Sequence, residues 1–318
     1  MYRLGVDLGG TNIAVGLVDE NFNIVCKKSV PTGAERGAEP IVEDMAKVCI
    51  AICEEMNVPL KDIVCVGIAT PGIANYETGY VEYTNNIPFV KFPIGPLLSE
   101  KLGGVKVFIE NDANAAALGE AVAGAARGTK SSVMITLGTG VGGGVIIDGK
   151  VFSGFNYAGP ELGHMVIERG GRPCTCGRSG CWEAYSSATA LIKMTREKLD
   201  ECVKNGEKTV MTSLVEKAGK VTGRTAFDAM REGDKAGSEV VDLYLSYLIT
   251  GLVNIVNIFQ PEVISLGGGV SNEGQWLVDR IYPLIYKEQY GSGIVKSTEL
   301  RIAKLKNDAG IIGAAMLG

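Results

Sequence analysis

The chain has 318 residues, a formal net charge of −5 and 46% hydrophobic residues, which fits a globular protein with more than one domain. The acidic balance and the lack of a Lys/Arg block argue against nucleic acid as a partner, because nucleic-acid binding relies on basic patches. The first residues do not match a signal peptide, and polar residues interrupt the most apolar segment, 243–259, so we predict a buried helix there, no membrane span and a cytoplasmic protein.

The N-terminal third alternates between predicted strands and helices. Residues 3–18 predict a strand, a glycine-rich turn and a second strand, with Asp7 ending the first strand. The elements expected next are a helix from Pro40 to Met56, a buried strand from Ile63 to Ala69, a helix from Ile94 to Leu102 and a strand from Val105 to Glu110. An alanine-rich helix follows Asn111, and Asp112 is a candidate for its N-cap.

The opening pattern recurs in the second half. SVMITLGTGVGGGVIID, from Ser132, again predicts a strand, a glycine-rich turn and a strand. Later, VISLGGGVS (263–271) resembles VCVGIATPG (64–72), since an apolar strand runs into glycine in both. The shared order predicts two copies of one α/β unit. Residues 186–240 are expected to be helical with solvated charged faces, and residues 309–318 to form a short helix of small residues.

The glycine-rich turns suit phosphate binding. The first contains Asp7, Gly9, Gly10, Thr11 and Asn12, and the second contains Gly138, Thr139 and Gly140. Glycines leave successive backbone N–H groups uncovered for an anion, and a carboxylate beside phosphate implies Mg²⁺ between them. A third cluster, formed by Gly267, Gly268 and Gly269, would let an adenine ring lie on the backbone. The alternatives are ordinary tight turns and a strand-to-helix loop, and neither hairpin turn matches a Walker or dinucleotide motif.

Residues 161–183 contain a candidate metal site. His164, the only histidine, precedes Cys174, Cys176 and Cys181, and three thiolates with one imidazole suit tetrahedral zinc. Free thiols or a disulfide are the alternatives. Glu161 and Glu183 flank the four candidate ligands, which suggests a substrate pocket beside the metal.

These motifs, in this order, resemble the sugar-kinase/Hsp70/actin superfamily. Glu161-Leu162-Gly163-His164 together with the cysteine motif of residues 174–183 is similar to the ROK family (repressors, open reading frames and sugar kinases), and the similarity covers essentially the whole chain. The resemblance implies a duplicated actin-like (ribonuclease H-like) ATPase fold of class α/β with two lobes around a cleft. The expected N-terminal lobe comprises residues 1–115 plus 302–318, and the C-terminal lobe, with the zinc motif, comprises residues 116–301.

Within the family the chain is most similar to ATP-dependent bacterial glucokinases. That implies phosphoryl transfer from ATP to a hexose, with glucose preferred; fructose, mannose, N-acetylmannosamine and allose are alternative acceptors, and polyphosphate is an alternative donor. A sugar-responsive repressor is disfavoured, because only Met1 to Val6 precede Asp7 and the charge is acidic. A chaperone-like ATPase is disfavoured by the zinc motif and the polar residues around it.

The resemblance also implies residue roles. Asp112 is the expected general base, which accepts the proton of the attacking hydroxyl. The expected sugar-binding residues are Asn86, Asn111, Asp112, Glu161, His164 and Glu183. The expected zinc is structural, since all four ligands are protein side chains. The implied assembly is a homodimer or a higher even oligomer.

Overall fold

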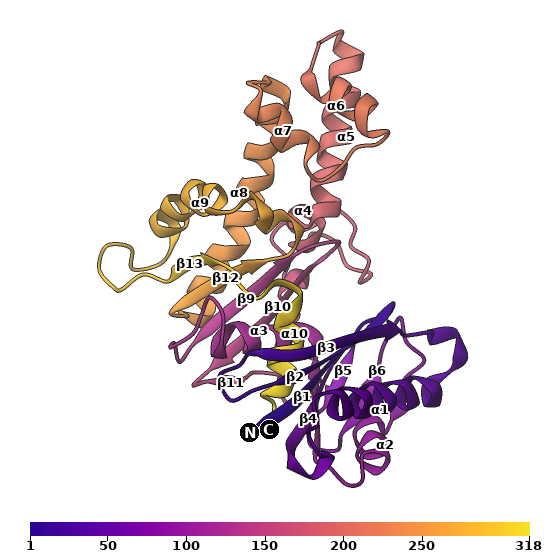
Figure 1. Ribbon diagram of the computed structural model, residues 1–318. Coiled ribbons are helices and arrows are strands. Elements are labelled where there is room, and N and C mark those ends of the chain that lie inside the picture. Colours follow the sequence, from indigo (N-terminus) through magenta and orange to yellow (C-terminus); the bar gives the residue numbers. More distant parts are fainter.

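Two five-stranded sheets with the same topology organise the chain in the computed structural model, which describes residues 1–318 (Figure 1). The first sheet has the order β3 (Ile24–Pro31), β2 (Asn12–Val18), β1 (Tyr2–Leu8), β4 (Ile63–Thr70) and β8 (Val107–Asn111). The second has the order β11 (Lys150–Val151), β10 (Val141–Ile147), β9 (Ser132–Leu137), β12 (Val263–Gly267) and β13 (Glu299–Ile302). The antiparallel and the parallel strand pairs occupy corresponding positions in the two sheets, which confirms the predicted duplication.

Two helices cover the outer face of the first sheet. They are α1 (Ala38–Glu55) and α2 (Ile94–Lys101), close to the predicted bounds. Buried residues of α1, such as Ile41, Met45 and Ile52, recur at helical spacing and join a core cluster of 26 buried residues. A small sheet lies beside α2, formed by β5 (Ile73–Asn75), β6 (Tyr80–Tyr83) and β7 (Val90–Phe92).

Helices α3 (Asp112–Val122) and α10 (Ala309–Ala315) lie between the two sheets (Figure 1). Glycine makes their packing possible: a Cβ added at Gly67 would collide with the carbonyl of Ala314, and one at Gly313 with the carbonyl of Ala115. Helix α10 packs on β1 and β4 as well as on α3, while α3 also packs on β10. The predicted lobe boundary between residues 115 and 116 falls inside α3 and stays a prediction.

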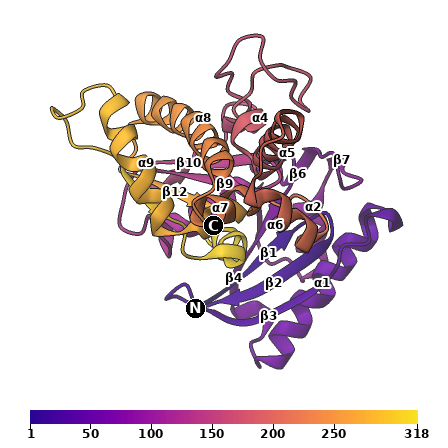
Figure 2. The same ribbon diagram turned by 90° about the horizontal axis from the view of Figure 1, so that it is seen from above.

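The remaining helices build the lobe around the second sheet (Figure 2). They are α4 (Glu183–Ser186), α5 (Ala188–Asn205), α6 (Val210–Ala218), α7 (Thr225–Arg231), α8 (Lys235–Phe259) and α9 (Gln275–Glu288). Helix α8 is long and apolar enough to cross a membrane by length and composition. However, its residues Val241, Leu248 and Leu252 are buried in a core cluster of 32 residues, which confirms the predicted buried helix.

Short 3-10 helices connect several of these elements. They are η1 (Ala34–Arg36), η2 (Leu60–Asp62), η3 (Leu162–His164), η4 (Gly269–Glu273) and η5 (Lys306–Asp308). Three of them contain residues of the candidate site described below: η3 contains His164, η4 begins at Gly269 and η5 contains Lys306.

Candidate active site

A cavity of about 730 Å³ lies between the two sheets and joins predicted residues from both halves of the chain. Its wall contains Asp7 from the end of β1, Asp112 from the start of α3, and the third glycine cluster, Gly267, Gly268 and Gly269, at the end of β12. Ligands of α/β proteins typically bind at the carboxyl ends of strands, where these residues lie. The structure therefore brings together the predicted base, the predicted magnesium-linked carboxylate and the third glycine cluster.

The third glycine cluster packs closely on the second glycine-rich hairpin. Gly268 has a left-handed backbone (φ 83°), and a Cβ added there would lie 2.6 Å from the backbone of Leu137, at the end of β9. Only glycine fits both the conformation and the space. This contact holds the proposed adenine-binding segment against the strand that leads into Gly138.

The start of α3 differs from the sequence expectation, because Asn111 and not Asp112 is the N-cap. The Asn111 backbone is extended, and its Oδ1 accepts hydrogen bonds from the backbone N–H groups of Ala113 (2.9 Å) and Asn114 (3.3 Å). Asp112 is the first helical residue, and its Oδ1 accepts from the N–H of Ala113 at 2.8 Å. Capping is thus supplied by Asn111, which leaves Oδ2 of Asp112 available to another group.

Burial raises the pKa values of both carboxyl groups in the cavity. The pKa of Asp7 rises to about 6, through burial first and the nearby charge of Asp112 second, with Lys27 acting in the opposite direction. The pKa of Asp112 is raised by burial, and the charge of Glu161 adds to the rise. Two neighbouring carboxylates repel each other, so the site favours a cation, and a raised pKa makes Asp112 a stronger base.

The first glycine-rich turn is held closed by backbone and hydroxyl contacts. The N–H of Gly9 donates to the carbonyl of Asn12 (2.9 Å), and the hydroxyl of Thr32 donates to the carbonyl of Gly9 (2.6 Å). Asn86 folds over this turn, since a Cβ added at Gly10 would lie 2.9 Å from its Nδ2. Gly9, Gly10, Thr11 and Asn12 do not line the larger cavity, although Asp7 before them does.

The second glycine-rich turn contacts Glu183. Within the turn, the N–H of Gly138 donates to the carbonyl of Gly140 (3.0 Å). At its end, the N–H of Val141 donates to Oε2 of Glu183 (3.0 Å). A smaller cavity of about 420 Å³ is lined by Thr139, Gly140 and Glu183 together with Cys174. The structure thus places this turn beside the cysteine motif and outside the wall of the larger cavity.

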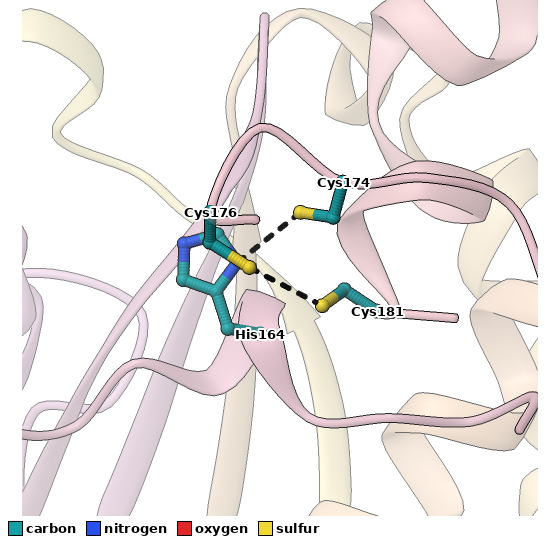
Figure 3. Close-up of side chains that lie close together, drawn as sticks. All are labelled: His164, Cys174, Cys176 and Cys181. Atoms are coloured by element: carbon teal, nitrogen blue, oxygen red, sulfur yellow. Dashed lines mark hydrogen bonds between the residues drawn. The ribbon is translucent and has the colours of Figure 1, made fainter. Parts of the chain in front are cut away.

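The four candidate metal ligands converge on one point (Figure 3). All their ligand atoms lie within 4.8 Å of one another; Nδ1 of His164 is 3.6 Å from Sγ of Cys174, and Sγ of Cys176 is 3.6 Å from Sγ of Cys181. Tetrahedral zinc, with Zn–S bonds of about 2.3 Å and Zn–N bonds of about 2.0 Å, requires S···S and S···N separations of roughly 3.8 and 3.5 Å. The residues present therefore fit zinc in both donor chemistry and spacing.

Only two of the six predicted sugar-binding residues line these two cavities. Asp112 lines the larger cavity and Glu183 the smaller one, so the six residues do not share one wall. Glu161 precedes η3, and this segment packs tightly on β10, because a Cβ at Gly163 would collide with the carbonyl of Val141. The charge of Glu161 acts on Asp112, which places these two carboxyl groups near each other.

Sequence reasoning missed several residues in the larger cavity. Lys306, Asn307 and Asn272 line its wall, and Lys306 is the only lysine or arginine among the 17 lining residues. Lys306 has a left-handed backbone (φ 52°), a conformation that is strained for lysine and recurs at functional sites. The sequence did contain one signal, because the polar run Lys306 to Asp308 comes shortly after β13, a parallel strand of the second sheet.

Comparison with known proteins identifies the family. Residues 3–318 match the ROK family, so the chain belongs to it. A glucokinase of Thermotoga maritima is 38% identical over 327 residues, covering 99% of this chain and 96% of the relative.

Solved structures agree with this assignment. The ROK hexokinase of Thermus thermophilus superposes with a TM-score of 0.80 at 35% identity, covering 100% of this chain and 98% of the other. A ROK family glucokinase of Streptomyces griseus, in complex with glucose and AMPPNP, gives a TM-score of 0.77 at 31% identity over 100% of this chain and 99% of the other. The family and these neighbours confirm the predicted two-lobed α/β fold.

Proposed function

We propose that the chain catalyses ATP-dependent phosphorylation of glucose to glucose 6-phosphate. The observation that carries the proposal is the meeting of Asp112, Asp7 and the third glycine cluster in one cavity between the two sheets. The similarity to glucokinases, one with glucose and an ATP analogue bound, supports the choice of substrates. A kinase for another hexose is the alternative, because preference among ring hydroxyls depends on loop geometry.

In the proposed reaction, Oδ2 of Asp112 accepts the proton of the sugar hydroxyl as its oxygen attacks the γ-phosphorus. The bond between the γ-phosphorus and the β–γ bridging oxygen breaks, and ADP leaves with that electron pair. A general base of this kind contributes about 10²–10⁴ in rate. The other contribution is positioning: those N–H groups of the glycine turns that make no internal hydrogen bond are proposed to orient the phosphates in line with the hydroxyl.

Magnesium fits the phosphate side of the site. Asp7 is the residue that would hold Mg²⁺, through water, because its buried carboxylate lies beside a second carboxylate and is stabilised by a cation. When bound, the ion neutralises phosphate charge. Lys306, on the same wall, adds a positive charge toward the nucleotide phosphates.

Zinc is proposed as a structural ion held by His164, Cys174, Cys176 and Cys181. The supporting observation is the convergence of all four donor atoms within 4.8 Å. Because Nδ1 faces the sulfur atoms, Nε2 of His164 remains for a sugar hydroxyl. The metal would then hold His164 and Glu183 in orientation and take no part in phosphoryl transfer.

Three further properties belong to the proposal. Closure of the lobes on sugar would bring the residues of the two cavities into one site, as in other kinases with mobile domains. A cytoplasmic location suits the eight cysteines, none of which forms a disulfide, because a reducing compartment keeps cysteines reduced. Assembly as a homodimer or a higher even oligomer rests on the resemblance to the family.

The direct experiment is product analysis by phosphorus NMR after incubating the purified protein with glucose, ATP and Mg²⁺. We expect glucose 6-phosphate and ADP in equal amounts. ATP hydrolysis without a sugar phosphate, or no ATP consumption at all, would overturn the proposed reaction.

A further inference from the structure

A buried carboxyl group lies directly before the predicted catalytic residues. Glu110, the residue before Asn111 in β8, is only 3% exposed. Its Oε1 accepts hydrogen bonds from the backbone N–H of Asn111 (2.9 Å) and from Nδ2 of Asn114 (3.1 Å). Its Oε2 accepts the hydroxyl of Ser153 at 2.7 Å. Each carboxyl oxygen thus has a partner, which repays the cost of burying a carboxyl group.

These contacts connect two parts of the site that are distant in sequence. Asn111 and Asn114 belong to the first turn of α3, which carries Asp112, whereas Ser153 follows β11 in the other half of the chain. The carboxyl group of Glu110 contacts both parts. A shift of its side chain would therefore move the two parts relative to each other.

The segment 153–159 is fixed at its base by the same network. The N–H of Gly159 donates to the carbonyl of Ser153 (3.0 Å), which closes the segment into a loop. Nδ2 of Asn114 also donates to the carbonyl of Gly159 (3.1 Å), so both ends of the loop are attached to β8 and α3. Asn114 is 1% exposed, and both its amide protons are used in this way.

The chain that leaves this loop is the one that carries Glu161. Only Pro160 separates Gly159 from Glu161, so little freedom remains between the anchored loop base and that carboxylate. Asp112 follows Glu110 by two residues on the other side of the network. The two predicted active-site carboxylates are therefore attached to the same buried group through short, constrained segments.

We propose that Glu110 is a positioning residue, whose carboxyl group holds the base of loop 153–159 against the start of α3 and so sets the placement of Glu161 relative to Asp112. The proposal rests on the proposed function, because it concerns the same sugar site. Glu110 does not touch substrate; it acts through Ser153 and Asn114. A carboxylate displaced by even about 1 Å in an active site costs up to 10²-fold in rate, which makes such bracing effective.

The test uses Ser153→Ala, which removes the hydrogen bond between Glu110 and the loop and leaves the contacts of Glu110 with Asn111 and Asn114 in place. We expect the KM and the calorimetric Kd for glucose to rise about tenfold, with the KM for ATP within about twofold of wild type. Glu110→Gln is the conservative variant: its Oε1 still accepts from Asn111 and Asn114, and its Nε2 faces the hydroxyl of Ser153 and donates to it. This variant should therefore keep the KM for glucose within about threefold of wild type.

The control is Thr195→Val, which removes another buried hydroxyl, one that bonds the carbonyl of Leu191 within α5. We expect it to shift Tm by a small amount and to leave the KM for glucose unchanged. A Ser153→Ala protein with wild-type KM and Kd for glucose, or one whose only change is a shift in Tm like that of the control, would overturn the positioning role. A wild-type protein that does not phosphorylate glucose would instead refute the proposed function, and the variants would then be compared on the hexose that it binds.

Discussion

Oε2 of Glu183 accepts a hydrogen bond from the backbone N–H of Val141 at 3.0 Å, at the end of the second glycine-rich turn. The other oxygen of Glu183 lies 3.8 Å from Sγ of Cys174. One carboxylate therefore contacts both the cysteine cluster and a turn proposed to bind phosphate. This contact physically links the proposed metal site with the phosphate side of the cleft.

The link predicts the effect of metal removal. We expect about one zinc per chain by elemental analysis, and loss of the metal should raise the KM for glucose more than the KM for ATP. Cys176→Ala should reproduce the effect, whereas Cys202→Ala, at a buried cysteine outside the cluster, should not. Equal loss of sugar and ATP binding would mean that the metal stabilises the whole lobe, and a metal-free protein of full activity would remove the zinc proposal.

Replacement of the predicted base separates binding from chemistry. Asp112→Asn keeps the side-chain shape and the contact with the N–H of Ala113 but cannot accept a proton. We expect kcat to fall by about 10²–10⁴ while the calorimetric Kd for glucose changes little. Near-normal turnover of this variant would show that another group accepts the proton.

The raised pKa of Asp7, about 6, predicts how activity depends on pH and magnesium. As pH falls through 6, the carboxyl of Asp7 gains a proton and no longer attracts Mg²⁺, so kcat/KM for ATP should fall. Saturating Mg²⁺ competes with the proton, so it should move this acid limb, the fall of kcat/KM at low pH, to lower pH. An acid limb that does not respond to Mg²⁺ concentration would contradict the role of Asp7, and Asp7→Asn should abolish the response.

Local patterns in the sequence were sufficient to predict the two glycine-rich hairpins and the repeated α/β unit, whereas the two-lobed actin-like fold was implied by the family resemblance. The glycine-rich hairpins at residues 3–18 and from Ser132 appear where alternating apolar residues flank glycines, because strand period and turn chemistry are both local. The N-cap was assigned to Asp112 in the sequence, but the structure assigns it to the neighbouring Asn111, whose side chain caps helices equally well. The extended backbone of Asn111 decides between them, and a sequence does not contain that information.

The residues that sequence reasoning missed depend on contacts between distant segments. Glu110 is the second-last residue of β8, and its partner Ser153 is 43 residues away. Lys306 reaches the cavity because α10 packs between the sheets through close glycine contacts. Neither placement follows from periodicity or from a local motif.

Lys306 gives a separate prediction for the nucleotide. As the only basic residue on the wall of the larger cavity, it should interact with the phosphates of ATP. We expect Lys306→Ala to raise the KM for ATP about threefold to tenfold, because the lysine is exposed and its interaction is screened by water. The KM for glucose should stay unchanged. Lys304→Ala, which removes an exposed lysine two residues away, is the matched control, and equal effects from both variants would contradict a specific role.

The chain is proposed to transfer a phosphoryl group from ATP to glucose. A panel of hexoses that includes glucose, fructose, mannose, N-acetylmannosamine and allose, assayed with ATP and Mg²⁺ for kcat/KM, tests it most directly. We predict the highest kcat/KM for glucose and the loss of this activity in Asp112→Asn. A panel in which no hexose is phosphorylated, or in which another hexose exceeds glucose, would contradict the account.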